Sequence, residues 1–214
     1  MRWVWVLLAL LLGVATAAQA DTLADAMKEL RLGHDASAMK MIRPLAERGN
    51  AHAQLYVGLM YAEGRGVPQN YAMAVKWYRL AARQGLANAQ YNLGVMYANG
   101  AGVPQNYATA IKWYRMAANQ GDAPAQYNLG VMYNDGTGVP RNYAMARKWY
   151  RLAARQGLAN AQYNLGVMYA EGRGVPRNYT VAAMWLGKAA RQGDIAAQID
   201  LGELRYGNVL GVVP

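Results

Sequence analysis

The sequence predicts an all-α fold in which short helical hairpins repeat along the chain as a solenoid. The first observation is that five glutamines stand 36 residues apart, at Gln54, Gln90, Gln126, Gln162 and Gln198. Four tryptophans keep the same spacing, at Trp77, Trp113, Trp149 and Trp185. In addition, residues 78–98 recur unchanged as residues 150–170. A fixed period of this length is typical of solenoids, because one repeat cannot bury its apolar face alone.

Residues 1–20 predict a signal peptide rather than a folded element. Arg2 supplies positive charge, residues 3–12 form an apolar run, and Ala18-Gln19-Ala20 offers small side chains for cleavage. Cleavage after Ala20 would export the chain to the periplasm or the medium, where it would not be an integral membrane protein. The alternative is an uncleaved anchor, although the apolar run is short for a membrane span. With no cysteine in the sequence, the chain can form neither disulfides nor a lipoprotein anchor.

Residues 21–49 predict an N-terminal capping hairpin, a degenerate first copy of the repeat. Apolar residues at helical spacing form a short helix that Gly33 ends, namely Leu23, Ala26, Met27 and Leu30. A second set lines the following helix, namely Ala38, Met41, Ile42, Leu45 and Ala46.

Four full repeats are predicted over residues 50–85, 86–121, 122–157 and 158–193, and the second of them shows their design. Its first helix has one apolar stripe, made by Ala89, Leu93, Gly94 and Tyr97. Gly94 allows close approach of the partner helix, and Gly100 can adopt the left-handed conformation that ends a helix. The Gly102-Val103-Pro104 segment then prevents continuation.

The second helix of the repeat begins after an asparagine that can accept a free backbone N–H group. This N-cap residue recurs as Asn70, Asn106, Asn142 and Asn178. The apolar stripe that follows is predicted to contain Tyr107, Ala110, Trp113, Tyr114, Ala117 and Ala118, with Gly121 after the helix. Large aromatic residues alternating with alanine and glycine favour close packing of a two-helix layer.

Residues 194–214 predict a C-terminal capping helix and a tail. The helix should span Asp194 to Tyr206, and its charged Glu203 and Arg205 favour a surface that faces solvent. The tail, residues 207–214, is apolar, and it either folds back on the last helix or frays.

These motifs resemble the Sel-one-like repeat (SLR) family, a branch of the tetratricopeptide-like superfamily. Its pattern is matched in the second repeat by Ala89, Leu93, Gly94, Tyr97, Gly100, Gly102, Val103, Ala110, Trp113, Ala117, Ala118 and Gly121. The resemblance implies a right-handed α/α solenoid of about five 36-residue hairpins. It also implies that the first helices line a concave groove, and that the family acts in envelope assembly, signalling or host interaction.

Outward positions of the first helices predict a groove for a partner segment. Tyrosine and asparagine recur side by side there, and acidic residues follow near the helix ends. The candidate groove residues are Tyr91, Asn92, Tyr127, Asn128, Asp135, Tyr163, Asn164 and Glu171. They can offer aromatic area, donors and acceptors to an extended peptide or to a glycan. The alternative is that the tyrosines pack between repeats and the asparagines are only solvated.

The second helices predict a basic ridge on the outer side of the solenoid, consistent with a net charge of +10. Spacings of three and four residues place each basic set on one helix face. The ridge comprises Lys76, Arg79, Arg83, Lys112, Arg115, Lys148, Arg151 and Arg155, and Lys188 and Arg191 continue it. Such a face usually serves solubility, and the alternative is attraction to anionic lipid or polysaccharide. Export argues against nucleic acid as the partner.

The residues offer little support for catalysis or for a cofactor. The histidines are His34 and His52, and Ser37 is the only serine. Ser37 and His34 stand at a helix start, where capping is the more common use of such residues. Two histidines without cysteine predict no metal site. Some cysteine-rich relatives in the family are described as β-lactamase-like, but this sequence lacks their cysteines and a serine-lysine motif.

Together these observations predict an exported, non-enzymatic scaffold that binds a protein segment in its groove and needs no cofactor. A glycan- or peptidoglycan-binding module is the main alternative, and a β-lactamase-like hydrolase is a remote one.

Overall fold

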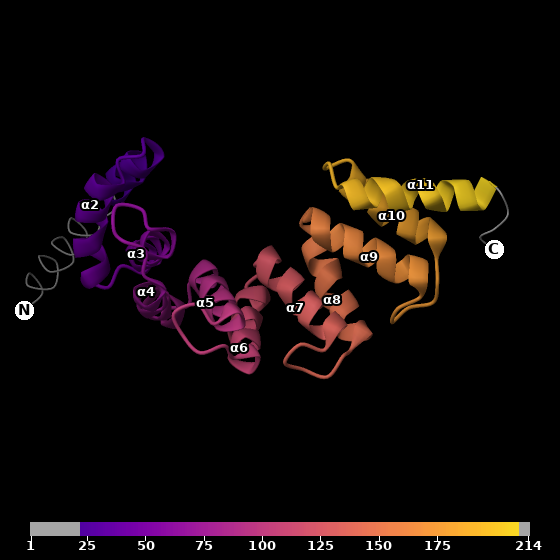
Figure 1. Cartoon of the computed structure of the whole chain (residues 1–214), viewed down its shortest axis with the longest axis horizontal. Coiled ribbons are helices and arrows are strands. Elements are labelled where there is room, and N and C mark those ends of the chain that lie inside the picture. Colours follow the sequence, from indigo (N-terminus) through magenta and orange to yellow (C-terminus); the bar gives the residue numbers. More distant parts are fainter. Residues whose placement is uncertain (1–21, 210–214) are drawn as a thin grey trace, which may run out of the picture. The chain divides into compact units, whose positions relative to one another are not determined.

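The computed structural model describes the backbone of residues 22–209 and the side chains of residues 22–204 (Figure 1). The predicted signal peptide and the end of the apolar tail lie outside the described residues. Within the described part, a helix at residues 22–31 precedes the labelled helices, and no strand occurs. The labelled helices are α2 (Asp35–Glu47), α3 (Ala51–Glu63), α4 (Tyr71–Arg83), α5 (Ala87–Asn99), α6 (Tyr107–Asn119), α7 (Ala123–Asp135), α8 (Tyr143–Arg155), α9 (Ala159–Glu171), α10 (Tyr179–Ala190) and α11 (Ile195–Val209). The prediction of an all-α repeat fold is confirmed.

The chain forms two compact units, one ending at Gln105 and the other beginning at Asn106. In the first unit, α3 packs against α2 and α4, and α4 packs against α5. In the second unit, each helix from α6 to α11 packs against the next one in the chain. Within the two units, α3, α7 and α9 thus each contact both the second helix of their own repeat and the second helix of the preceding one.

Local sequence sets where the helices begin and end. The predicted N-caps are confirmed, because each asparagine accepts the N–H of the third residue after it. Asn142, for example, accepts from the Met145 N–H at 2.9 Å. At the other end, the glycines after α3, α5, α7 and α9 adopt the left-handed conformation, as at Gly100 with φ of 68°. A non-glycine residue would be strained there.

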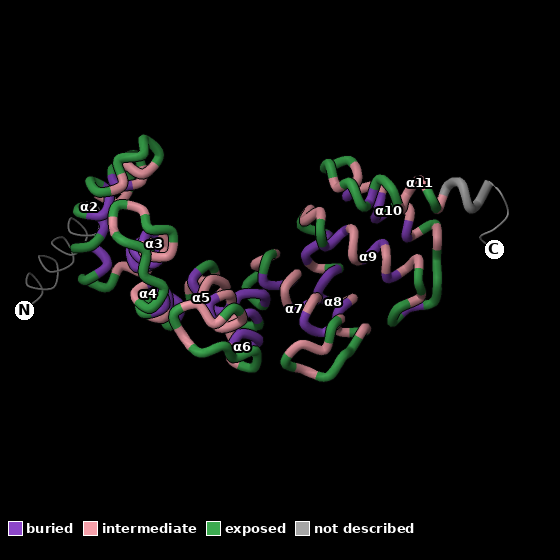
Figure 2. Tube along the Cα trace, viewed as in Figure 1, coloured by how far each residue is buried: buried purple, intermediate pink, exposed green. Residues whose placement is uncertain are grey.

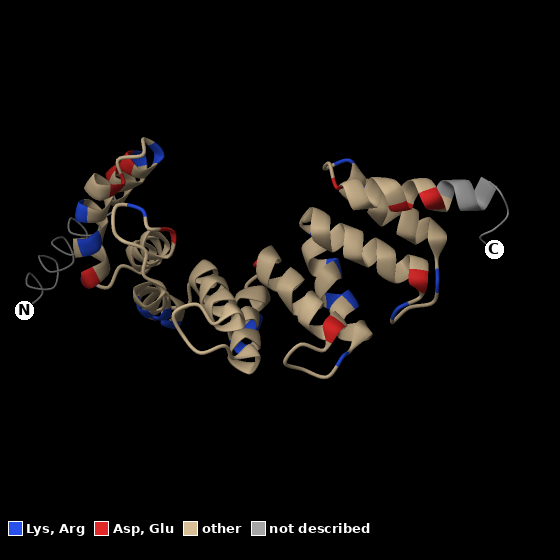
Figure 3. Ribbon diagram, viewed as in Figure 1, with Lys and Arg blue, Asp and Glu red and all other residues tan. Residues whose placement is uncertain are grey.

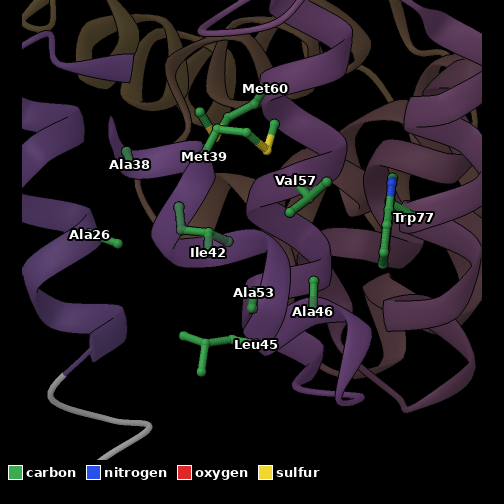
Figure 4. Packing of buried hydrophobic residues seen from close by; sticks show 10 residues of the cluster. All are labelled: Ala26, Ala38, Met39, Ile42, Leu45, Ala46, Ala53, Val57, Met60 and Trp77. Atoms are coloured by element: carbon green, nitrogen blue, oxygen red, sulfur yellow. The ribbon is translucent and has the colours of Figure 1, made fainter. Parts of the chain in front are cut away.

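In the repeats formed by α3 and α4, by α7 and α8, and by α9 and α10, the core lies between the two helices, where buried segments follow the inner faces (Figure 2). Figure 4 shows the N-terminal cluster, in which Ala26, Ile42 and Leu45 pack beside Val57 and Met60. Helices at residues 22–31 and 35–47 occupy the predicted hairpin, although Met39 is buried and Met41 only partly so.

On α3, α7 and α9, a glycine receives a large side chain from the second helix of the same repeat. A Cβ atom at Gly58 would lie 2.6 Å from the Tyr78 ring, and one at Gly166 would lie 2.8 Å from Leu186. Gly130 meets Tyr150 in the same way. Since real Cβ atoms do not approach so closely, these glycines let the two helices of a hairpin pack tightly.

The predicted stripe of the second helix is wrong at one position. Tyr107 is 37% exposed, whereas Ile111 is buried. Tyr107 is the first residue of α6, one full turn outside the core, and its Cβ instead contacts the loop at Gly138. Trp113 is half-buried.

The second glycine of each loop lets adjacent repeats touch. Gly66 has φ of +66°, and a Cβ there would lie 2.5 Å from the Asp35 carbonyl oxygen at the start of α2. Gly102, Gly138 and Gly174 approach the preceding repeat in the same way. The glycine loops are therefore turns and inter-repeat contacts.

Candidate functional site

The predicted groove residues keep part of their surface accessible. Tyr127, Asn128, Tyr163 and Asn164, on α7 and α9, are half-buried, and so are Tyr91 and Asn92 on α5. The row does not extend to the first repeat, where Leu55 is buried. Within the second compact unit, α7 and α9 each present a Tyr-Asn pair.

The buried side chain of Tyr150 contacts one residue of each pair. Its ring lies over Gly130 and has its centroid 5.9 Å from that of Tyr127. Burial, with a smaller contribution from Tyr127 and Asp135, raises the pKa of Tyr150, so the hydroxyl stays neutral. The Asn164 amide donates a hydrogen bond to that hydroxyl. Tyr127 and Asn164 are thus held in place by contacts to one buried ring.

Tyr163 is anchored toward the C-terminal end. Its hydroxyl donates a hydrogen bond to Asp200 of α11, and its ring packs beside Leu186 and Ala197. Partial burial is the largest cause that raises the pKa of Tyr163, followed by the negative charge of Asp200. This tyrosine therefore also serves packing between repeats.

Asn92 and Asn128 differ from Asn164. Among the residues that the structure describes, neither side chain has a hydrogen-bond partner, although both are half-buried. A half-buried amide with unused donors and acceptor can bind a backbone or another polar group of a ligand.

The two acidic groove residues are exposed and differ in pairing. Asp135 accepts a hydrogen bond from the adjacent Asn134 side chain at 2.8 Å. Glu171 forms an ion pair of 2.5 Å with Arg173, which partly neutralises the negative charge of Glu171. Of the two, Asp135 keeps more of its negative charge available.

Lysines and arginines recur on the second helices (Figure 3), and those of the basic ridge have two roles. Arg79 donates to the Tyr97 hydroxyl at 2.9 Å, Arg115 donates to the Tyr133 hydroxyl, and Arg43 does the same with Tyr61. These bonds join a second helix to the next first helix. By contrast, the described structure gives Lys76, Arg83, Lys112, Arg151 and Arg155 no such bond, and all five are exposed.

The repeated glutamines have a role that sequence reasoning did not identify. Gln126, buried on α7, donates to the Ala118 carbonyl at 3.1 Å and accepts from Gln156 at 2.9 Å. Gln156 also donates to the Gly121 carbonyl at 2.9 Å. The pattern recurs at Gln54 and Gln162, so each glutamine links the C-terminal ends of two second helices.

Gln126→Leu should therefore lower the free energy of unfolding by about 1–2 kcal/mol. The substitution keeps the volume but removes hydrogen bonds at a buried position. Urea denaturation followed by circular dichroism measures the loss. The control is Gln69→Leu on a loop. It removes exposed hydrogen bonds to the Ala62 carbonyl and the Tyr71 hydroxyl that water can replace, so it should change stability by less than about 0.5 kcal/mol. Equal losses in both variants would contradict the role of the buried glutamine.

Asp122 caps α7 at the cost of burying a carboxylate. It accepts from the Ala125 N–H at 2.8 Å, yet burial outweighs this bond and raises its pKa. Below the ordinary pKa of aspartate both folded and unfolded states are protonated. As the pH rises, the unfolded state ionises first, so this residue reduces stability toward neutral pH.

Asp122→Asn should keep the N-cap of α7 and remove the loss of stability that the buried carboxylate causes toward neutral pH. Asn50, two periods earlier, caps α3 in the same way. We expect the variant to be more stable than the parent at pH 7, by less than about 1 kcal/mol, and to lose this advantage below pH 4. Urea denaturation across pH 3–7 tests this, and an unchanged pH profile would contradict it.

The residues considered for catalysis lie at the N-terminal cap. His34 Nδ1 lies 3.0 Å from Glu29, and His34 makes no side-chain cap bond to α2, so the proposed capping use is wrong. Ser37 is exposed in the first turn of α2. Across the described residues, no group of three or more metal-binding side chains gathers. The same residues contain no helix long and apolar enough to cross a membrane.

Comparison with known proteins identifies the repeat. The model of the Sel1 repeat matches residues 51–86, 87–122, 123–158 and 159–194, one residue later than the repeats predicted above. No curated protein matches.

Solved structures show the same fold. The chain is 43% identical, with a TM-score of 0.80, to c5321, a protective antigen of uropathogenic Escherichia coli with an SLR fold. That match covers 86% of this chain but 42% of the E. coli chain, so this chain spans less than half of its length. A Sel1 repeat protein from Oxalobacter formigenes is 34% identical over 88% of this chain and 75% of its own, with a TM-score of 0.82.

Sel1 repeat proteins generally mediate protein–protein interactions and are typically non-enzymatic scaffolds. Four consecutive matches to the repeat, its helical hairpins and the similarity to solved Sel1 repeat structures lead to one conclusion. The chain belongs to the Sel1 repeat family.

Proposed function

We propose that this chain is an exported scaffold that binds an extended segment of a protein partner along the first helices. The Tyr127-Asn128 pair of α7 forms the core of the site, and the Tyr163-Asn164 pair of α9 flanks it. The single observation that carries the proposal concerns Asn128 and its neighbour Tyr127. Asn128 is half-buried and has no hydrogen-bond partner among the described residues, and the Tyr127 ring beside it packs against Tyr150.

The anchored side chains support this arrangement. Tyr127 and Asn164 are already held through Tyr150, so ligand binding would cost little side-chain entropy. The amide of Asn128 can then donate to and accept from the backbone of an extended peptide, as in strand-like recognition. Asn92, on α5 in the first unit, offers the same unused amide.

The charge along this surface favours a partner with a basic end. Asp135 is exposed near the C-terminus of α7. Farther along, a cavity of about 360 Å³ between α9 and α11 is lined by Val167 and Leu204 together with Glu171, Asp200 and Glu203. Carboxylates around an apolar floor fit a lysine or arginine flanked by apolar side chains.

The test is to compare two sets of variants in capture from an envelope extract. Tyr127→Ala combined with Asn128→Ala removes the site, whereas Lys76→Glu combined with Lys112→Glu alters exposed ridge residues that make no described bond. We expect the first pair to lose at least 90% of the captured partner and the second pair to retain it. Arg115 is excluded from the ridge set because its loss would disturb the bond to Tyr133.

Retention by the groove pair and loss by the ridge pair would contradict the proposal. Sedimentation with purified cell-wall polymer provides the matched test for a glycan. Co-pelleting that depends on Tyr127 and Asn128 would replace the protein segment by a glycan as the ligand.

A further inference from the structure

The second helices of the second compact unit carry charge of one sign only. Helices α6, α8 and α10 contain lysine and arginine but neither aspartate nor glutamate. The acidic residues of residues 106–214 lie on α7, α9 and α11 or directly precede α7 and α11 (Figure 3). Solubility is served equally well by a surface on which both signs are interspersed, so a face with one sign of charge indicates a further use.

The cations of α8 share one face and have no acidic partner. Lys148, Arg151 and Arg155 follow one another at spacings of three and four residues, and all three are exposed. Within the part of the chain that the structure describes, none of them forms an ion pair or a hydrogen bond. Like charges at these spacings repel one another, so an anion bound to this face would relieve the repulsion.

The neighbouring second helices continue this face. The glutamines just after α8 and α10 each donate to the carbonyl of the glycine that follows the preceding second helix, at 2.9 and 2.8 Å. These bonds join the C-terminal ends of α6, α8 and α10. The 36-residue register then makes Lys112 of α6 equivalent to Lys148, and Arg191 after α10 equivalent to Arg155. Lys112 and Arg191 are exposed as well.

Two methionines are exposed on the same face. Met116 is 46% exposed and lies four residues after Lys112 on α6. Met184 is 47% exposed on α10, at the position that a lysine occupies on α6 and α8. A lipid bilayer offers both anionic headgroups for the cations and an apolar region for the methionines. An acidic polysaccharide offers the charge without the apolar region.

The first compact unit has the same combination on α4. Lys76 and Arg83 are exposed, and Leu80, which lies between them in the sequence, is 38% exposed. Spacings of four and three residues place the three side chains on one helix face. Exposed apolar side chains among unpaired cations are therefore a recurring feature of the second helices.

We infer that the cationic face of the second unit binds the surface of a lipid bilayer that contains anionic headgroups. The face consists of Lys112, Met116, Lys148, Arg151, Arg155, Met184 and Arg191. Its lysines and arginines contact the headgroups, and its methionines enter the boundary between headgroups and acyl chains. The proposed groove residues lie on the first helices, so this inference does not depend on the proposed function.

Co-sedimentation with lipid vesicles tests the inference. One vesicle preparation contains phosphatidylglycerol and phosphatidylcholine in equal amounts, and the other contains phosphatidylcholine alone. The chain of residues 21–214 is used, because it keeps every described residue and omits the apolar run of residues 3–12, whose own affinity for lipid would mask the effect. We expect a partition coefficient about tenfold higher or more with phosphatidylglycerol. Raising the salt from about 0.1 M to about 0.5 M should reverse most of this difference, because screening shortens the reach of surface charge.

Two variants test the two parts of the face. Lys148→Gln, Arg151→Gln and Arg155→Gln together should lower the partition coefficient about tenfold or more, since each cation near an anionic surface contributes several-fold. Met116→Gln combined with Met184→Gln keeps side-chain length and helix propensity but removes the apolar groups, and we expect about fivefold weaker binding. Circular dichroism checks that both variants fold like the parent.

The matched control removes the same charge from exposed loop positions of the same unit, by Arg141→Gln, Arg173→Gln and Arg177→Gln. It should weaken binding by less than about threefold, and Tyr127→Ala combined with Asn128→Ala should bind vesicles like the parent. Equal losses in the loop and α8 variants would overturn the inference, because net charge alone would then explain binding. Absence of binding, or equal binding to both kinds of vesicle, would also overturn it. Unchanged binding of the methionine variant would do the same, and capture by immobilised polygalacturonate that depends on the α8 cations would then make an acidic polysaccharide the ligand.

Discussion

Gly130→Val is expected to lower the free energy of unfolding by about 3 kcal/mol, because the new side chain would overlap the buried Tyr150 ring. The Tyr150 ring cannot turn aside, since it is only 2% exposed and fixed between α7 and α8. Valine is a better helix former than glycine, so the loss arises from packing and not from helix propensity. Urea denaturation with circular dichroism measures it.

Gly202→Val is the matched control for this prediction. It makes the same substitution at the equivalent helix position, where no atom of the described residues lies within 4 Å of the added Cβ. Its stability should stay within about 0.5 kcal/mol of that of the parent. A comparable loss at both positions would show that the close contact with Tyr150 does not explain the glycine.

Gly138→Ala should cost about 2–4 kcal/mol, the other large effect. One part is backbone strain, because φ is +71°, and the other is collision with Tyr107 at the start of α6. Burial of Ile111 beside the same glycine leaves little room for adjustment. Differential scanning calorimetry or urea denaturation detects the loss.

Gly157→Ala separates the two causes. Its φ of +95° also strains a non-glycine backbone, but no atom of the part of the chain that the structure describes lies within 4 Å of the added Cβ. We expect a cost of about 1 kcal/mol for this variant. If Gly157→Ala were as damaging as Gly138→Ala, the contact between the loop and the preceding repeat would contribute nothing to stability.

Much of the fold could be predicted because the repeat period and the cap residues act locally. Asn142 and Gly100 determine a helix start and a helix end through bonds within a few residues, so their roles follow from sequence. Helical spacing alone did not determine which residues of a predicted apolar stripe are buried. Tyr107 has the spacing of a core residue, yet it lies in the first turn of α6, beyond the edge of the core.

Contacts between repeats were harder to predict. The 36-residue spacing of the glutamines marked the register but not their hydrogen bonds, because the carbonyl partner belongs to another helix. The Arg79–Tyr97 bond spans 18 residues, half a period, and the same separation recurs from Arg115 to Tyr133. The recurring 18-residue separation of arginine and tyrosine is visible in the sequence. It could have predicted that Arg79 and Arg115 join neighbouring helices.

The groove prediction combined residues with different roles. Tyr163 and Asn164 have the same sequence spacing as the tyrosines and asparagines of the other repeats, yet their polar groups bind Asp200 and Tyr150. Asn128 occupies the equivalent position without such a partner in the described structure. Sequence repetition shows which positions are equivalent, but local neighbours decide which side chains stay available to a ligand.

Site-specific photo-crosslinking tests the proposed function most directly. A photoreactive benzoylphenylalanine replaces Asn128 in one chain and Lys112 in another, and adducts are resolved by electrophoresis after illumination of cells that produce each chain. The proposal predicts a discrete protein adduct from position 128 and none from position 112. An adduct from position 112 with none from position 128 would contradict it, because the partner would then lie on the basic ridge.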